Sequence, residues 1–218
     1  MVGIRVVLGR RPAIAVKVRN ESDVNHNQKP NRLSAAVTLT AGAPSLNPLQ
    51  FVARQMTNGD QISMEIAGAE PGSYSVEISA YGAYVKSATT GSTDLLHDEL
   101  LVPEDGGIAP IEVVLSDDGG QVAGSVKLPE RDSPATVLLV PEAGLSKEIR
   151  TVVTEATGQF EFEQVRPGSF ILLAFDRVEG LEFRNPDVLS SYLSSGTHVS
   201  VASRQAVAAS PELILFDK

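Results

Sequence analysis

The sequence predicts an all-β protein that contains two tandem antiparallel β-sandwiches and at most one short helix. Three observations predict this class: short runs of β-branched residues, clusters of Gly, Pro, Asn and Asp between the runs, and an internal repeat. Short strands separated by turn residues are typical of sandwiches. At 218 residues, the chain is long enough for two units of about 100 residues each.

Segments with strand composition occur along the whole chain. The alternation is clearest where Ile14, Val16 and Val18 recur at every second position, so one face of that strand is expected to be buried. Segment 20–30 is rich in Asn, Asp and Pro and predicts an exposed loop. The predicted strands are 4–8, 13–19, 35–39, 62–66, 74–79, 84–87, 99–102, 111–115, 121–127, 135–140, 149–154, 159–162, 170–175, 198–201 and 211–216.

One segment has a helical pattern. Apolar residues recur at a spacing of three to four positions between Val188 and Leu193, after an Asn185-Pro186-Asp187 start and before Gly196. The pattern predicts a helix of one or two turns. Because an α/β fold needs repeated helices between its strands, that class is disfavoured.

The internal repeat consists of 62–76 and 158–172, aligned on Pro71-Gly72 and Pro167-Gly168, which lie 96 positions apart. In each copy, alternating apolar residues form a strand, Pro fixes φ for a turn and Gly permits positive φ. We therefore predict two homologous domains, 1–118 and 119–218, which meet at the 117–120 turn. The matched apolar positions are Met64, Ile66, Ala69 and Tyr74 in the first copy, and Phe160, Phe162, Val165 and Phe170 in the second.

The second copy resembles a known family. Residues 157–162 (Thr-Gly-Gln-Phe-Glu-Phe), 165–170 (Val-Arg-Pro-Gly-Ser-Phe), 121–126 and 135–141 are similar to the hallmark segments of bacterial carboxypeptidase regulatory-like domains. Residues 1–118 resemble that family more loosely, because Ala69-Glu70 departs from its usual turn. The resemblance implies an immunoglobulin-like or prealbumin-like sandwich within the carbohydrate-binding-like folds, and an accessory module without catalytic residues.

Composition and charge argue against several kinds of partner. The net charge is −9 and basic residues are scattered, so nucleic acid is not expected as a partner. No apolar stretch approaches the roughly 18 residues that span a bilayer, so no membrane insertion is expected.

The chain has no cysteine, which excludes disulfides and thiolate metal sites. Residues 1–5 do not resemble a signal peptide, so either the protein is cytoplasmic or its export signal lies outside this chain.

No catalytic or cofactor site is predicted. His26, His97 and His198 lie in different segments, without the pattern that holds a catalytic zinc. No Gly-x-Ser-x-Gly or phosphate loop occurs. The 23–34 segment starts like a calcium loop, but Gln28 and Ser34 stand where such a loop needs Gly and Glu.

A self-formed isopeptide bond, which related pilin and adhesin domains often carry, is not expected. Lys17 and Lys127 lie on suitable strands, yet the last predicted strand of each domain contains no Asn. Sugar binding usually relies on exposed aromatic rings, and this chain has no Trp and only 5% aromatic residues. Tyr81, Tyr84 and Tyr192 are the candidate binding residues. For each of them a supporting role inside the sandwich is the favoured interpretation.

The leading hypothesis is a non-catalytic structural or interaction module of a larger exported bacterial protein, which is secreted, periplasmic or on the cell surface. It would space domains, or present loops and sheet edges to other domains of the parent chain or to a protein partner. The alternative is a carbohydrate-binding module that takes a polysaccharide, and an enzyme is the least favoured class. Self-association through sheet edges stays open.

Overall fold

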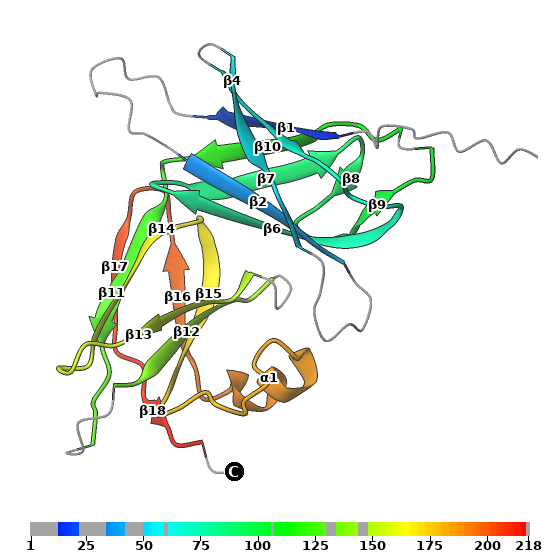
Figure 1. Ribbon diagram of the computed structural model, residues 1–218. Coiled ribbons are helices and arrows are strands. Elements are labelled where there is room, and N and C mark those ends of the chain that lie inside the picture. The colour runs from blue at the N-terminus through cyan, green and yellow to red at the C-terminus, as the bar shows by residue number, and fades with distance from the viewer. Residues whose placement is uncertain are drawn as a thin grey trace, which may run out of the picture. The chain divides into compact units, whose positions relative to one another are not determined.

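The computed structural model describes residues 13–21, 34–41, 50–58, 61–105, 107–129, 134–143 and 148–216. The chain divides into two compact units, Met1–Ser116 and Asp117–Lys218. Each unit has its own sheets (Figure 1) and its own core. Among the described residues the protein is all-β apart from one short helix. No helix in these residues is long and apolar enough to cross a bilayer.

The first unit contains two sheets. One has the strand order β4-β5-β1-β10-β7-β8 and the other β3-β2-β6-β9. Neighbouring strands are antiparallel except β1 and β10, which are parallel. The strands are β1 (Ile14–Asn20), β2 (Ser34–Ala41), β3 (Gln50–Val52), β4 (Arg54–Asn58), β5 (Gln61–Ile66), β6 (Gly72–Tyr81), β7 (Tyr84–Thr90), β8 (Thr93–Asp94), β9 (Leu100–Val102) and β10 (Ile111–Ser116).

The core of the first unit lies between these two sheets, because each sheet contributes every second residue of its strands. Ile14 and Val16 from β1 pack in the same cluster as Val37 and Leu39 from β2. Tyr74 on β6 is buried as well, and its hydroxyl donates to the Glu70 carbonyl at 2.8 Å. The tyrosine therefore fills the core while its polar atom keeps a partner.

The second unit also has two sheets, with the orders β14-β11-β17 and β13-β12-β15-β16, and β18 pairs with β15. The β11–β17 and β15–β18 pairs are parallel and the others are antiparallel. The strands are β11 (Gly120–Ser125), β12 (Thr136–Pro141), β13 (Arg150–Val153), β14 (Gln159–Val165), β15 (Gly168–Phe175), β16 (Thr197–Val201), β17 (Ala206–Ala209) and β18 (Leu213–Ile214).

Strands β12 and β15 are buried on both faces. Val137 and Leu172 face the β14-β11-β17 sheet, while Leu138 and Leu173 face the other way. That second face is covered by α1 (Pro186–Leu193) and the segment before it, through Leu181 and Leu189. Burial on both faces explains why these two strands are almost continuously apolar instead of alternating.

The two copies of the repeat have the same local backbone. Gly72 and Gly168 have φ of +153° and +157°, and the preceding aligned pair, Gly68 and Gln164, also has positive φ of 84° and 50°. The aligned apolar residues of both copies are buried, as predicted, with Tyr74 and Phe170 at equivalent places. The repeated sequence therefore encodes a repeated turn.

Several sequence predictions need correction. The predicted strand 211–216 is not continuous, because Pro211 cannot donate a ladder hydrogen bond and only Leu213–Ile214 pairs, with β15. Strands β3, β4, β8 and β17 were not predicted. Asn20, expected in a loop, ends β1. The predicted strand 4–8 and most of the 20–30 loop lie outside the described residues.

Candidate functional site

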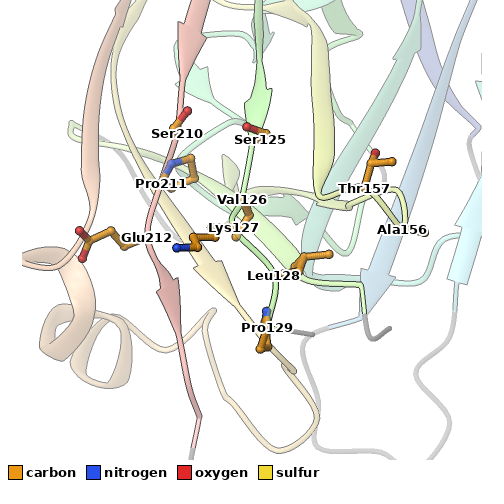
Figure 2. A pocket seen from close by; sticks show the side chains of 10 residues that line it. All are labelled: Ser125, Val126, Lys127, Leu128, Pro129, Ala156, Thr157, Ser210, Pro211 and Glu212. Atoms are coloured by element: carbon orange, nitrogen blue, oxygen red, sulfur yellow. The ribbon is translucent and has the colours of Figure 1, made fainter. Parts of the chain in front are cut away.

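A groove of about 630 Å³ lies in the second unit, where the chains that leave β11 and β17 separate (Figure 2). One wall is the continuation of β11, residues 125–129, and the other is the crossover 210–212. This crossover carries the chain from β17 in one sheet to β18 in the other. Ala156 and Thr157 from a neighbouring turn complete the lining.

The groove exists because the parallel ladder between β11 and β17 stops. The Gln121 N–H donates to the Gln205 carbonyl at 2.8 Å, so the odd-numbered residues of β11 direct their main-chain groups toward β17. After the pair Gly124 and Ala209, the next β17-side residue that should donate is Pro211. Proline has no N–H. The Ser125 carbonyl and the Lys127 N–H therefore face the groove instead of a strand.

The opposite side of the same segment is fixed. The Val126 N–H donates to the Gly158 carbonyl at 2.9 Å, which ties residues 125–129 to the turn before β14. Gly158 has φ of +83°, and a Cβ there would lie 2.1 Å from the Val126 carbonyl oxygen. Only glycine permits this close approach. The 125–129 segment, which continues from β11, is thus held at Val126 on one edge, with its other edge turned to the groove.

The side chains of the groove add polar groups over an apolar base. Val126 and Pro211 are buried, whereas Lys127 and Glu212 are exposed. Figure 2 shows the Lys127 side chain extending from the 125–129 wall toward the 210–212 crossover. Neither Lys127 nor Glu212 forms an ion pair with another described residue. Main-chain groups at the end of a strand, a cation and a buried apolar base are the features that an extended peptide can use.

The three candidate tyrosines are not brought together. Tyr81 ends β6 with 75% of its surface exposed, and Tyr84, which starts β7 in the other sheet of the first unit, is half-buried. Tyr192 belongs to the second unit, where its ring packs edge-on against Phe175 with centroids 5.2 Å apart. Tyr192 therefore helps to attach α1 to the sheet, and only Tyr81 presents an open aromatic face.

Each described histidine lies beside one carboxylate. The Nδ1 atom of His97 is 2.9 Å from the Asp94 carboxylate, and that of His198 is 2.6 Å from Glu142. Partial burial acts to raise the pKa of Asp94, and the His97 ring and the Leu96 N–H outweigh it, so the pKa lies below its ordinary range. No group of three potential metal ligands occurs among the described residues. His26 lies outside them.

The two lysines considered for an isopeptide bond both lie on the exposed face of their segments. The Nζ atom of Lys17 is 3.9 Å from the Glu112 carboxylate on the neighbouring strand, and its side chain is 64% exposed. Lys127 lines the groove. An isopeptide bond needs a lysine that points into a buried site, so the geometry of Lys17 does not suit one.

Sequence analysis did not identify the groove. The sequence singles out Lys127 only as a candidate for an isopeptide bond, and it predicts a strand that begins at Pro211. A signal was present, since Pro211 interrupts the expected last strand and proline is rare inside a ladder. What the sequence did not reveal is that β17 and β11 are parallel neighbours, which places Pro211 beside Lys127.

Comparisons with known proteins give distant similarities only. No family model matches the chain, and no curated protein matches it either. Among solved structures, the chain is similar to a streptococcal ancillary pilin, with 13% identity over 92% of this chain and 68% of that chain and a TM-score of 0.28. It is also similar to GBS52, the minor pilin of Streptococcus agalactiae, with 9% identity over 91% and 94% of the chains and a TM-score of 0.30.

A third similar structure is the Bacillus anthracis TIE protein, with 11% identity, a TM-score of 0.29, and coverage of 94% of this chain and 42% of that chain. These TM-scores are too low to carry an argument about function. The all-β fold rests on the strands and cores described above.

Proposed function

We propose that this chain is a non-catalytic structural and interaction module of a larger exported bacterial protein, secreted, periplasmic or on the cell surface. Its domains, 1–118 and 119–218, would hold other parts of the parent protein apart and present sheet edges to a protein partner. The proposal includes membership of the carboxypeptidase regulatory-like family, which the motifs at 157–162 and 165–170 support.

The observation that carries the proposal is the groove beside residues 125–129. The end of a strand with one edge held and the other edge facing a groove is a ready acceptor for an extended chain. The Ser125 carbonyl and the Lys127 N–H supply main-chain groups, and main-chain pairing gives affinity without requiring a catalytic side chain. Such a site suits a module that binds by its sheet edges.

The experiment is hydrogen exchange on the full chain with and without a pool of short extended peptides. We expect added protection at amides of sheet edges, and no turnover when ester, peptide and glycoside substrates are offered. A hydrolytic activity that survives purification and disappears with a single substitution would contradict the proposal. Equal exchange with and without peptides at every edge would also count against it.

A carbohydrate-binding module is the second candidate, and the exposure of Tyr81 favours it. The open tyrosine face at the end of β6 could stack on a sugar ring. A glycan panel read by thermal shift tests this candidate, because a ligand that binds only the native state raises the unfolding midpoint. A shift that Tyr81→Ala removes, and Tyr192→Phe leaves in place, would favour sugar binding over the leading proposal.

A further inference from the structure

The two units share a strand plan. In the first unit β5, β1 and β10 are neighbours in that order, and in the second unit β14, β11 and β17 are. In both, the first pair is antiparallel and the second pair is parallel. The parallel ladder is longer in the first unit, so the first unit can show which part of the ladder the second unit lacks.

The ladder registers align the two units residue by residue. The repeat matches Met64 with Phe160, and these residues pair with Val16 on β1 and Gly124 on β11. Val16 and Gly124 are thus equivalent. Their parallel partners are Ile111 and Ala209, which are therefore equivalent as well. Counting onward, position 113 of the first unit corresponds to position 211 of the second.

From this point the two units differ. In the first unit the parallel ladder continues through Val18 with Val113, and the Glu21 N–H still donates to the Leu115 carbonyl at 2.8 Å. In the second unit the residue equivalent to Val113 by this count is Pro211, which does not pair with β11, and the chain leaves for the other sheet. The groove thus occupies the place where the first unit has residues 112–115 of its own β10.

We propose that the groove binds an extended peptide segment of a partner protein, which lies parallel to residues 125–129 and completes the interrupted ladder. This inference rests on the proposed function and names the partner's chemistry. One residue of the peptide would accept from the Lys127 N–H and donate to the Ser125 carbonyl, as Val113 is placed to do in the first unit.

Charge indicates which peptides fit. Lys127 is equivalent to Arg19, and the residue opposite Arg19 on β10 is Val114. A peptide with an acidic residue at that position would place a carboxylate across from the Lys127 ammonium. The first unit contains the same kind of pair two residue pairs earlier, between Lys17 and Glu112. The favoured segment therefore alternates apolar and acidic residues.

The probe is fluorescein-Glu-Val-Glu-Leu-Ser-amide, which follows residues 112–116 with glutamate in place of Val114, because Ala208 and Ala209 already fill the places equivalent to 110 and 111. Its partner probe has lysine in place of that glutamate, and a third probe is N-methylated on the valine. Binding to the full 218-residue chain is measured by fluorescence polarisation, and hydrogen exchange locates it. We expect the acidic probe to bind about five-fold more tightly than the basic one, because an exposed ion pair contributes up to about 1 kcal/mol.

The N-methylated probe lacks the donor to Ser125 and should bind at least about ten-fold more weakly. Two substitutions of Lys127 distinguish the contribution of its main-chain N–H from that of its side-chain charge. Lys127→Gln keeps the N–H, so it should retain binding and lose the preference for the acidic probe. Lys127→Pro removes the N–H and should lose binding of both. Lys17→Gln, a matched change of an exposed lysine in the first unit, should behave like the unchanged protein.

Thermal unfolding confirms that each variant is folded before its binding is interpreted. The inference is overturned if the unchanged protein does not bind the acidic probe, or if Lys127→Pro binds it as well as the unchanged protein does. Probe-dependent protection at another edge, such as β9 or β13, with no protection at Lys127, would reject this groove and leave the proposed interaction function standing.

Discussion

At the scale of single residues, Gly124 shows how closely β11 and β17 approach. A Cβ at this position would lie 1.7 Å from the Ala209 carbonyl oxygen, which no side-chain movement relieves because the oxygen belongs to the main chain. The glycine is therefore part of the reason that the parallel ladder forms up to this rung.

We expect Gly124→Ala to lower the free energy of unfolding of the second unit by about 2 to 4 kcal/mol, in the range of strongly destabilising single substitutions. Chemical denaturation measures this loss. Gly107→Ala is the control, since a Cβ there would have Asp105 as its nearest neighbour at 3.6 Å, an ordinary contact. Similar losses for both variants would mean that the β11–β17 contact is looser than described.

Asp94 gives a residue-scale dependence on pH. Its pKa lies below the ordinary value of 3.8, so the folded state binds the proton less readily than the unfolded state. The stability that this carboxylate adds is complete well above pH 3.8, and it is lost as the pH falls through the lower, folded-state pKa.

We therefore expect Asp94→Asn to destabilise the first unit at pH 7 by less than about 1 kcal/mol, since the pair with His97 is exposed. Denaturation of both proteins between pH 2 and 7 should show the difference shrinking below the ordinary carboxylate pKa. A difference that stays constant down to pH 2 would assign the effect to packing instead of charge.

At the scale of elements, Pro211 lies in the crossover between β17 and β18, two residues after β17 ends. Replacing it with alanine returns an N–H to the position that faces the Ser125 carbonyl. We expect Pro211→Ala to let the chain's own backbone extend the ladder by one rung. Hydrogen exchange should then show a protected amide at position 211, and the acidic probe should bind at least about five-fold more weakly, because it competes with this bond.

Val207→Ala is the matched comparison, because it shortens a half-buried side chain of β17 and leaves every main-chain group in place. It should not change the affinity for the probe by more than about two-fold, given that side chains of β17 do not line the groove. An unprotected amide at position 211 in the alanine variant, with unchanged probe binding, would contradict the prediction.

The elements that sequence analysis identified are those whose signal is local. Helix α1 begins where Asn185 accepts a hydrogen bond from the Asp187 N–H at 3.1 Å, as the Asn-Pro-Asp start indicates. The long strands follow from alternation or from continuous apolar runs. Strand β17 has only four residues, Ala-Val-Ala-Ala, and its assignment depends on pairing with β11. No local pattern predicts that pairing, and the groove depends on it.

At the scale of the whole molecule, each unit has its own hydrophobic core. Leu39 is fully buried in the core of the first unit, and Leu172 is fully buried in that of the second. A buried leucine truncated to alanine costs about 2 to 5 kcal/mol. Because the cores share no residues, the loss should stay within the unit that carries the substitution.

We expect a fragment of residues 117–218 to fold alone, with the same dispersed NMR spectrum that it contributes to the full chain. Leu172→Ala should lower its unfolding midpoint and leave the transition of the first unit unchanged, and Leu39→Ala should do the reverse. Calorimetry of the full chain and the fragment tests both statements. A single transition that both substitutions shift equally would show that the two units unfold together.

The parallel pairing of β1 with β10 has a mechanical consequence. These are the first and last described strands of the first unit, and they run in the same direction side by side. Tension between the amino end of β1 and the carboxyl end of β10 pulls the two strands past each other, so it loads their rungs in shear, all at once. Hydrogen bonds loaded in shear must break together, whereas hydrogen bonds pulled from one end of a ladder break one after another. A module built so resists extension, and its lifetime under tension is set by its unfolding rate.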